Sequence, residues 1–127
     1  MLILLDTSIL IEIDAGNQKV ISKLSELANG YPASDCAISW VNFFEFYYGS
    51  MGDQKMAENC LQFLNKFSFL EMTKEATKIF TRFRKEKTNV KDFDLLIGSI
   101  AIANNALLVT MDGDFKRIKG LNYRLIE

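Results

Sequence analysis

Five apolar runs of about four residues, separated from one another by segments of helical period, constrain the fold of this chain most strongly. A run this short that is apolar on both faces is typical of a strand buried in a parallel sheet. Helices between such strands cover both faces of the sheet, so we expect an α/β fold, a three-layer α/β/α sandwich around a mostly parallel sheet of roughly five strands. The expected strands are residues 2–5, 36–39, 69–72, 106–109 and 123–126.

Hydrophobic periodicity predicts helices in the segments between these strands. Helix ends are indicated by Gly at the carboxyl end and by Asp or Thr at the N-cap. The segment WVNFFEFYYG is so rich in aromatic side chains that we expect its helix to be largely buried. The expected helices are residues 18–29 before Gly30, residues 40–49, a helix capped by Asp53, a helix capped by Thr73, and a nearly all-apolar helix that opens at Asp92 or Asp94 and ends at residues 104–105.

The length of 127 residues predicts one domain that spans residues 1–127. A single proline and the lack of low-complexity sequence argue against a linker. No apolar run approaches the roughly 18 residues of a membrane span, and the N-terminus lacks the basic segment of a signal peptide. Cys36 and Cys60 stand alone, which favours reduced thiols in the cytoplasm.

The chain contains no histidine, and this excludes several kinds of active site. Neither a Ser-His-Asp triad nor a His-ligated zinc site can form. Catalysis must therefore depend on carboxylates, hydroxyls and lysines, and any catalytic metal must be bound by oxygen atoms. The net charge of −1 gives no overall basic signal for nucleic acid, although seven of the 15 Lys and Arg residues lie between Lys74 and Lys91.

Acidic residues follow the first and fourth expected strands. Asp6 comes directly after residues 2–5, and Asp112 and Asp114 come just after residues 106–109. Because sites in parallel sheets form beyond the carboxyl ends of the strands, we expect these carboxylates to converge. Asp94, at the start of the helix before the fourth strand, belongs at the same edge. Taken singly, each of these residues has an ordinary structural explanation as a helix cap or a turn residue.

Glu45 is unusual because it lies within the aromatic segment FFEFYY. A carboxylate desolvated there needs a cation or hydrogen-bond donors. Several carboxylates gathered at one edge also repel one another by several kcal/mol unless cations intervene. Oxygen ligands without His or Cys favour Mg²⁺ or Mn²⁺, which activate water in phosphodiester hydrolysis. The sequence therefore suggests a metal-dependent phosphodiesterase.

Four segments, in order along nearly the whole chain, carry a resemblance to a known family. They are LLDTSIL (residues 4–10), SWVNFFEFYYG (39–49), DFDLLIGSIAIANNALLVTMDGDF (92–115) and GLNYRLI (120–126). Together they resemble the PIN domain, and within it the VapC-type ribonuclease toxins of toxin–antitoxin pairs.

By resemblance, Asp6, Glu45 and Asp94 match the first three acids of the family. The fourth is open, because the loop TMDGDF is one residue shorter than the usual family form. Asp114 is the formal match, and Asp112 occupies a position nearer the strand. Residues matching the hydroxyls that line the site or support its carboxylates are Thr7, Ser8 and Thr110.

The resemblance implies an endoribonuclease that depends on Mg²⁺ or Mn²⁺, forms a homodimer and is blocked by a cognate antitoxin protein whose C-terminal segment occupies the active-site groove. A basic run just before Asp94 then has two readings of similar weight, a solvated helix face or a phosphate-binding surface for RNA. Its residues are Arg82, Arg84, Lys85, Lys87 and Lys91.

Two other functions fit parts of the sequence. The acids are structural if the chain is a PIN-like protein-interaction module with little or no nuclease activity, and residues 43–48 then offer a partner surface. A receiver-like phosphoacceptor also gathers aspartates at strand ends. The sequence disfavours this reading, because Asp6 has no adjacent acid and no lysine lies at a late strand end.

Overall fold

The five expected strands form a single sheet with the order β3-β2-β1-β4-β5. A computed structural model describes residues 2–30, 35–49 and 53–127. Every pair of neighbouring strands is parallel, so the predicted mostly parallel sheet is in fact parallel throughout. The strands are β1 (Leu2–Leu5), β2 (Asp35–Ser39), β3 (Ser68–Leu70), β4 (Leu107–Thr110) and β5 (Tyr123–Leu125).

Five helices lie where the sequence indicated them, whereas the helices at residues 7–14 and 113–117 were not among those expected. The side chains of Asp53 and Thr73 cap their helices by accepting hydrogen bonds from the backbone N–H groups of Met56 and Ala76. The apolar helix begins at Asp92, so Asp94 lies in its first turn and is not its N-cap. The helices are α1 (Thr7–Asp14), α2 (Gln18–Asn29), α3 (Trp40–Tyr48), α4 (Gln54–Leu64), α5 (Lys74–Lys85), α6 (Asp92–Ala103) and a short 3₁₀ helix, η1 (Gly113–Arg117).

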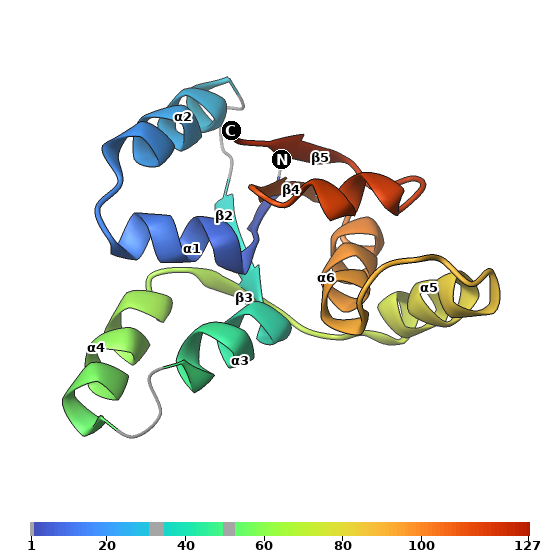
Figure 1. Cartoon of the computed structure of the whole chain (residues 1–127), viewed down its shortest axis with the longest axis horizontal. Coiled ribbons are helices and arrows are strands. Elements are labelled where there is room, and N and C mark those ends of the chain that lie inside the picture. Colours follow the sequence, from blue (N-terminus) through green and yellow to red (C-terminus); the bar gives the residue numbers. More distant parts are fainter. Residues whose placement is uncertain (1, 31–34, 50–52) are drawn as a thin grey trace.

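The two faces of the sheet support separate hydrophobic cores. On β1, Leu4 packs into a core with α5 and α6, whereas Ile3 and Leu5 pack on the opposite face against α1, α2 and α4. Leu108 and Val109 of β4 divide between the two faces in the same way. Figure 1 shows α1, α2 and α4 on one side of the sheet and α5 and α6 on the other. The three-layer α/β/α prediction is confirmed.

Helix α3 is not largely buried, contrary to the prediction from its aromatic content. Trp40, Phe44 and Tyr48 expose 46%, 53% and 57% of their surface, and Asn42 is its one fully buried residue. Phe44 also contacts Phe93 of α6, with ring centroids 6.0 Å apart. The aromatic composition therefore marks an exposed face, which we call the aromatic face and define by Trp40, Phe44, Tyr48 and Phe93.

None of the helices in the described ranges is both long enough and apolar enough to cross a membrane.

The close approach of α6 to the segment after β4 depends on a glycine. A Cβ atom added to Gly98 would lie 2.7 Å from Cδ1 of Ile118, a buried residue that follows η1. Helix α6 also contacts η1, which follows the loop after β4. Gly98 thus helps to set the distance between α6, which carries Asp94, and the segment after β4, which carries Asp112 and Asp114.

We predict that Gly98→Val lowers the free energy of unfolding by about 1–3 kcal/mol, because the larger side chain overpacks the space filled by Ile118. Chemical denaturation measures this change. Gly49→Val is the matched control, since a Cβ at Gly49 meets its nearest neighbour, the backbone oxygen of Phe46, at an ordinary 3.5 Å. Equal losses of stability in the two variants would contradict the prediction.

Candidate active site

Asp6 lies at the carboxyl end of β1 and is 5% exposed. Its Oδ2 atom accepts hydrogen bonds from Oγ1 of Thr110, at 2.7 Å, and from Oγ of Ser8, at 2.9 Å. Burial raises the pKa of Asp6 above its ordinary value, the two hydroxyls oppose this shift, and the charge of Asp112 adds to it. The hydroxyls therefore support a carboxylate that burial alone would disfavour.

Glu45 reaches the same edge from α3. Its Oε1 atom accepts a hydrogen bond of 2.9 Å from Oγ1 of Thr7, which in turn accepts one of 3.0 Å from the side-chain amide of Asn42. Partial burial raises the pKa of Glu45, the Thr7 hydrogen bond lowers it, and the charge of Asp6 raises it. Glu45 and Asp6 are thus electrostatically coupled although they belong to different elements.

Asp94 is the carboxylate most affected by its neighbours. Its pKa is raised to about 6, first by burial and then by the charges of Asp112, Asp6 and Glu45, while Lys91 lowers it. Since Asp94 interacts with Asp112, Asp6 and Glu45, the structure brings together four of the five acids that the sequence placed at one edge.

Both aspartates of the loop after β4 lie near Asp94. Carboxylate oxygens of Asp94, Asp112 and Asp114 lie within 4.8 Å of one another. Asp112 also caps η1, because its Oδ1 accepts a hydrogen bond from the Asp114 backbone N–H. The two differ in their other partners: the charge of Asp112 acts on Asp6 and Asp94, whereas Asp114 faces Arg117 at 3.7 Å.

The chemistry of this acidic cluster fits a divalent cation. Within the described ranges, no Lys or Arg forms a salt bridge with Asp6, Glu45, Asp94 or Asp112. Like charges raise one another's pKa when nothing neutralises them, and a cation relieves that repulsion. The donors are carboxylate oxygens only, a set that suits Mg²⁺ or Mn²⁺.

Asn42 is a residue of this site that the sequence reasoning missed. It is fully buried, and it accepts hydrogen bonds at Oδ1 from both the backbone N–H and the hydroxyl of Ser39. Two signals were present in the sequence. Ser39 and Asn42 have the spacing of a helix N-cap and its N3 partner, and Asn42 precedes Glu45 by about one helical turn.

The basic residues near Asp94 have different environments. The guanidinium of Arg84 is engaged within the protein, since it donates to the backbone oxygens of Thr88 and Val90 and pairs with Asp92 at 2.9 Å. By contrast, the remaining members of the run are exposed, namely Arg82, Lys85, Lys87 and Lys91.

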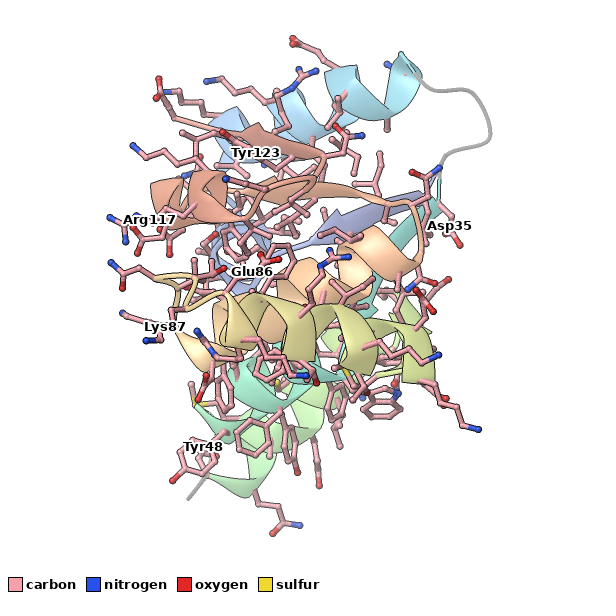
Figure 2. All side chains as sticks on the ribbon, turned by 90° about the vertical axis from the view of Figure 1, so that its right-hand side faces the viewer. Asp35, Tyr48, Glu86, Lys87, Arg117 and Tyr123 are labelled. Atoms are coloured by element: carbon pink, nitrogen blue, oxygen red, sulfur yellow. The ribbon has the colours of Figure 1, made fainter. Side chains whose placement is uncertain are left out.

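Exposed basic side chains lie at the same edge as the acids. Figure 2 places Lys87 and Arg117 at the edge opposite Asp35, the first residue of β2, which is the edge toward which the parallel strands run. Tyr48 of the aromatic face lies toward this edge as well.

A groove with a volume of about 450 Å³ adjoins the acidic cluster between α1, α3 and α4. Thr7 and Glu45 are among its lining residues, and much of the remaining lining is apolar. Ile11 and Met56, which line it, are 53% and 56% exposed. The groove is therefore an open, largely apolar channel that leads to one of the carboxylates.

Comparisons with known proteins agree with this geometry. Ribonuclease VapC3 from Methanocaldococcus jannaschii is 31% identical over 97 residues, which are 76% of this chain and 94% of the relative. A crystal structure of VapBC2 from Rickettsia felis, bound to a DNA fragment from their promoter, matches all of both chains at 27% identity, with a TM-score of 0.83. VapBC-1 from nontypeable Haemophilus influenzae has the same fold over 98% of both chains, at 21% identity and a TM-score of 0.82.

The family model described as the PIN domain matches residues 3–121. This match covers the sheet up to β4, the helices and every acid of the cluster. The chain belongs to the PIN domain family.

Proposed function

We propose that this protein is a divalent-metal-dependent endoribonuclease that hydrolyses RNA phosphodiester bonds, and that it is the toxin of a VapBC-type toxin–antitoxin module. The observation that carries the proposal is the convergence of Asp6, Glu45, Asp94 and Asp112, none of which forms a salt bridge with a Lys or Arg in the described part of the chain. The name of its relative from Methanocaldococcus jannaschii, a ribonuclease, supports the same activity.

In this proposal Asp6, Glu45, Asp94 and Asp112 hold one or two Mg²⁺ or Mn²⁺ ions. Such ions lower the pKa of water and stabilise charge on phosphate oxygens. Asp112 is the fourth acid because its charge reaches both Asp6 and Asp94. Asp114 lies at the rim, where Arg117 offsets its charge. The protein's own hydroxyls orient the carboxylates, so the ligands are arranged before a cation binds.

The RNA backbone lies along the exposed basic residues beside the acids. Lys91 is close enough to Asp94 to lower its pKa, and Lys87 and Arg117 lie at the same edge. Cations placed there attract phosphate groups that the acidic cluster alone would repel. Arg84 is left out of this surface because its donors are used inside the protein. Neither Cys36 nor Cys60 forms a disulfide, which fits a cytoplasmic location.

An antitoxin segment occupies the groove between α1, α3 and α4 in this proposal. Apolar side chains of a partner would cover Ile11 and Met56, and the segment would end beside Glu45. The VapBC structures with the same fold support an antitoxin as the partner.

The homodimer forms through the aromatic face. Four neighbouring aromatic side chains, each more than 40% exposed, make a patch that a second protein surface would cover favourably. The patch adjoins the acids, since Phe44 and Phe93 immediately precede Glu45 and Asp94. A dimer through this face brings two acidic clusters near one interface.

Asp94→Asn and Asp112→Asn are each expected to lower kcat/KM for RNA cleavage by at least about 100-fold, because each removes a cation ligand. Asp114→Asn is expected to lower it by less than about tenfold. Cleavage of a structured RNA panel with Mn²⁺, and with EDTA in its place, measures these effects. Asp35→Asn, which removes the charge of an exposed carboxylate at the opposite edge of the sheet, serves as the control.

Unchanged cleavage in Asp94→Asn would show that the assigned site is wrong. If the parent protein neither cleaves RNA nor binds Mn²⁺ in calorimetry, the chain is instead an interaction module.

The pKa of Asp94 leads to a prediction about stability without metal. A pKa raised to about 6 in the fold, above the ordinary value of 3.8, means that the folded state holds the proton more tightly than the unfolded chain. The contribution of this group to stability is therefore lost as pH rises through about 6. Metal-free Asp94→Asn is expected to melt at a higher temperature than the parent at neutral pH, and this advantage shrinks toward about pH 4.

Thermal melts across this pH range provide the measurement. Saturating Mn²⁺ is expected to raise the melting temperature of the parent more than that of Asp94→Asn, because ligand binding stabilises the fold that binds it. A difference between parent and variant that stays constant with pH would count against the assignment.

Phe44→Arg is expected to convert a dimer to a monomer, because it places a charge in the centre of the aromatic face. Light scattering after size-exclusion chromatography measures the mass. Ile11→Arg is a matched control, since both side chains are 53% exposed but Ile11 lines the groove. A parent that is monomeric at high concentration, or dissociation by Ile11→Arg alone, would refute this interface.

A further inference from the structure

Asn42 uses its whole amide to connect the start of α3 to the acidic cluster. Its Oδ1 accepts from the backbone N–H of Ser39 at 3.1 Å and from the Ser39 hydroxyl at 2.7 Å. Its Nδ2 donates to Oγ1 of Thr7 at 3.0 Å. Thr7 then donates to Glu45 at 2.9 Å. The amide is fully buried, so each of these bonds would be costly to lose.

The direction of these hydrogen bonds is fixed by chemistry. A backbone N–H can only donate, so the Asn42 atom facing Ser39 must be the carbonyl oxygen. The NH₂ group must then face Thr7, and the Thr7 oxygen must act as its acceptor. The hydroxyl proton of Thr7 is consequently left to point at Glu45. The Glu45 carboxylate can only accept, so it also requires Thr7 to donate, and Asn42 holds the Thr7 hydroxyl in the orientation in which it does so.

Glu45 depends on this one contact. Within residues 2–30, 35–49 and 53–127, Thr7 is its single hydrogen-bond partner. The residues on either side of Glu45 in the sequence, Phe44 and Phe46, have side chains that cannot donate a hydrogen bond. A Thr7 hydroxyl released by Asn42 could rotate, and the Glu45 carboxylate would lose its fixed orientation.

The hydroxyls of Thr110 and Ser8 also accept one hydrogen bond and donate another to a carboxylate, but they accept it from a backbone N–H. Thr110 accepts from the Asp112 N–H at 3.0 Å and donates to Asp6, and Ser8 accepts from the Met111 N–H at 3.1 Å and also donates to Asp6. Only Thr7 is directed by a side chain. Substitution of Asn42 therefore releases the Thr7 hydroxyl beside Glu45 without changing the hydroxyls that donate to Asp6.

We infer that Asn42 is a positioning residue, which acts through Thr7 to hold Glu45 in the orientation that binds a divalent cation. The inference rests on the proposed metal-dependent function and adds a residue that lies outside the cluster of acids.

The test is calorimetric titration of metal-free protein with Mn²⁺ alone, together with a melting temperature for each variant. Asn42→Leu and Thr7→Val are each expected to weaken Mn²⁺ binding by about tenfold, the usual effect of removing a partner that orients a metal ligand. Thr7→Ser keeps the hydroxyl and is expected to bind as the parent does. If Asn42 acts through Thr7, the double variant binds no more weakly than Thr7→Val alone.

Ser39→Ala separates stability from positioning. It removes the capping hydroxyl but keeps the backbone N–H that orients Asn42, so it is expected to melt at a lower temperature with Mn²⁺ affinity within about twofold of the parent. Asn42→Ser, which is too short to reach Thr7, replaces Asn42→Leu if the latter fails to fold.

Three results would overturn the inference. Parent-like Mn²⁺ affinity in the Asn42 variants would reduce Asn42 to a structural role. Additive losses in the double variant would mean that Asn42 acts by a route other than Thr7. A parent protein that binds no Mn²⁺ would remove the proposed function, and this inference with it, whereas failure of the Asn42 variants alone leaves the proposed function intact.

Discussion

The hydrogen bond from Thr110 to Asp6 is the interaction on which the rest of the acidic edge depends. It joins the ends of the neighbouring strands β1 and β4, and the Asp112 backbone N–H, which donates to the Thr110 oxygen, holds the hydroxyl in this orientation. The same arrangement recurs at Ser8 and at Thr7. Each hydroxyl accepts one hydrogen bond from a nitrogen atom and donates one hydrogen bond to a carboxylate.

The hydrogen bonds from these hydroxyls oppose a larger effect, the cost of burying several carboxylates close to one another. Burial and mutual repulsion raise the pKa of Asp6, Glu45 and Asp94, while hydrogen bonds lower that of Asp6 and Glu45. In the part of the chain that the structure describes, Asp94 accepts no hydrogen bond from a hydroxyl, and Lys91 is the charge that lowers its pKa. Its pKa of about 6 reflects that difference. The carboxylates of Asp6 and Glu45 are therefore oriented without a cation, and a cation would relieve the repulsion among the acids.

The sequence predicted the features that follow from hydrophobic periodicity and from the common direction of the strands. Strands that are apolar on both faces indicated a parallel sheet, and strand ends indicated where Asp6 and Asp112 meet. It did not predict the exposure of Phe44, because aromatic content does not reveal which face of a helix lacks a neighbour. Asn42 was missed because its partner, Thr7, is 35 positions away in the sequence and belongs to another helix. Hydrophobic periodicity and composition give no information on contacts between side chains that lie so far apart in the sequence.

The pairing of β1 with β4 has a consequence for the order in which the protein acquires its chemistry. Asp6 and Thr110 are 104 positions apart, so the acidic edge is a product of long-range contact. During synthesis, β1, β2 and β3 precede α6 and the loop that carries Asp112. A nascent chain that ends before β4 lacks a complete set of acids, whatever structure it has already formed. With this topology, the acidic cluster is completed only after β4 and the loop that carries Asp112 have been made.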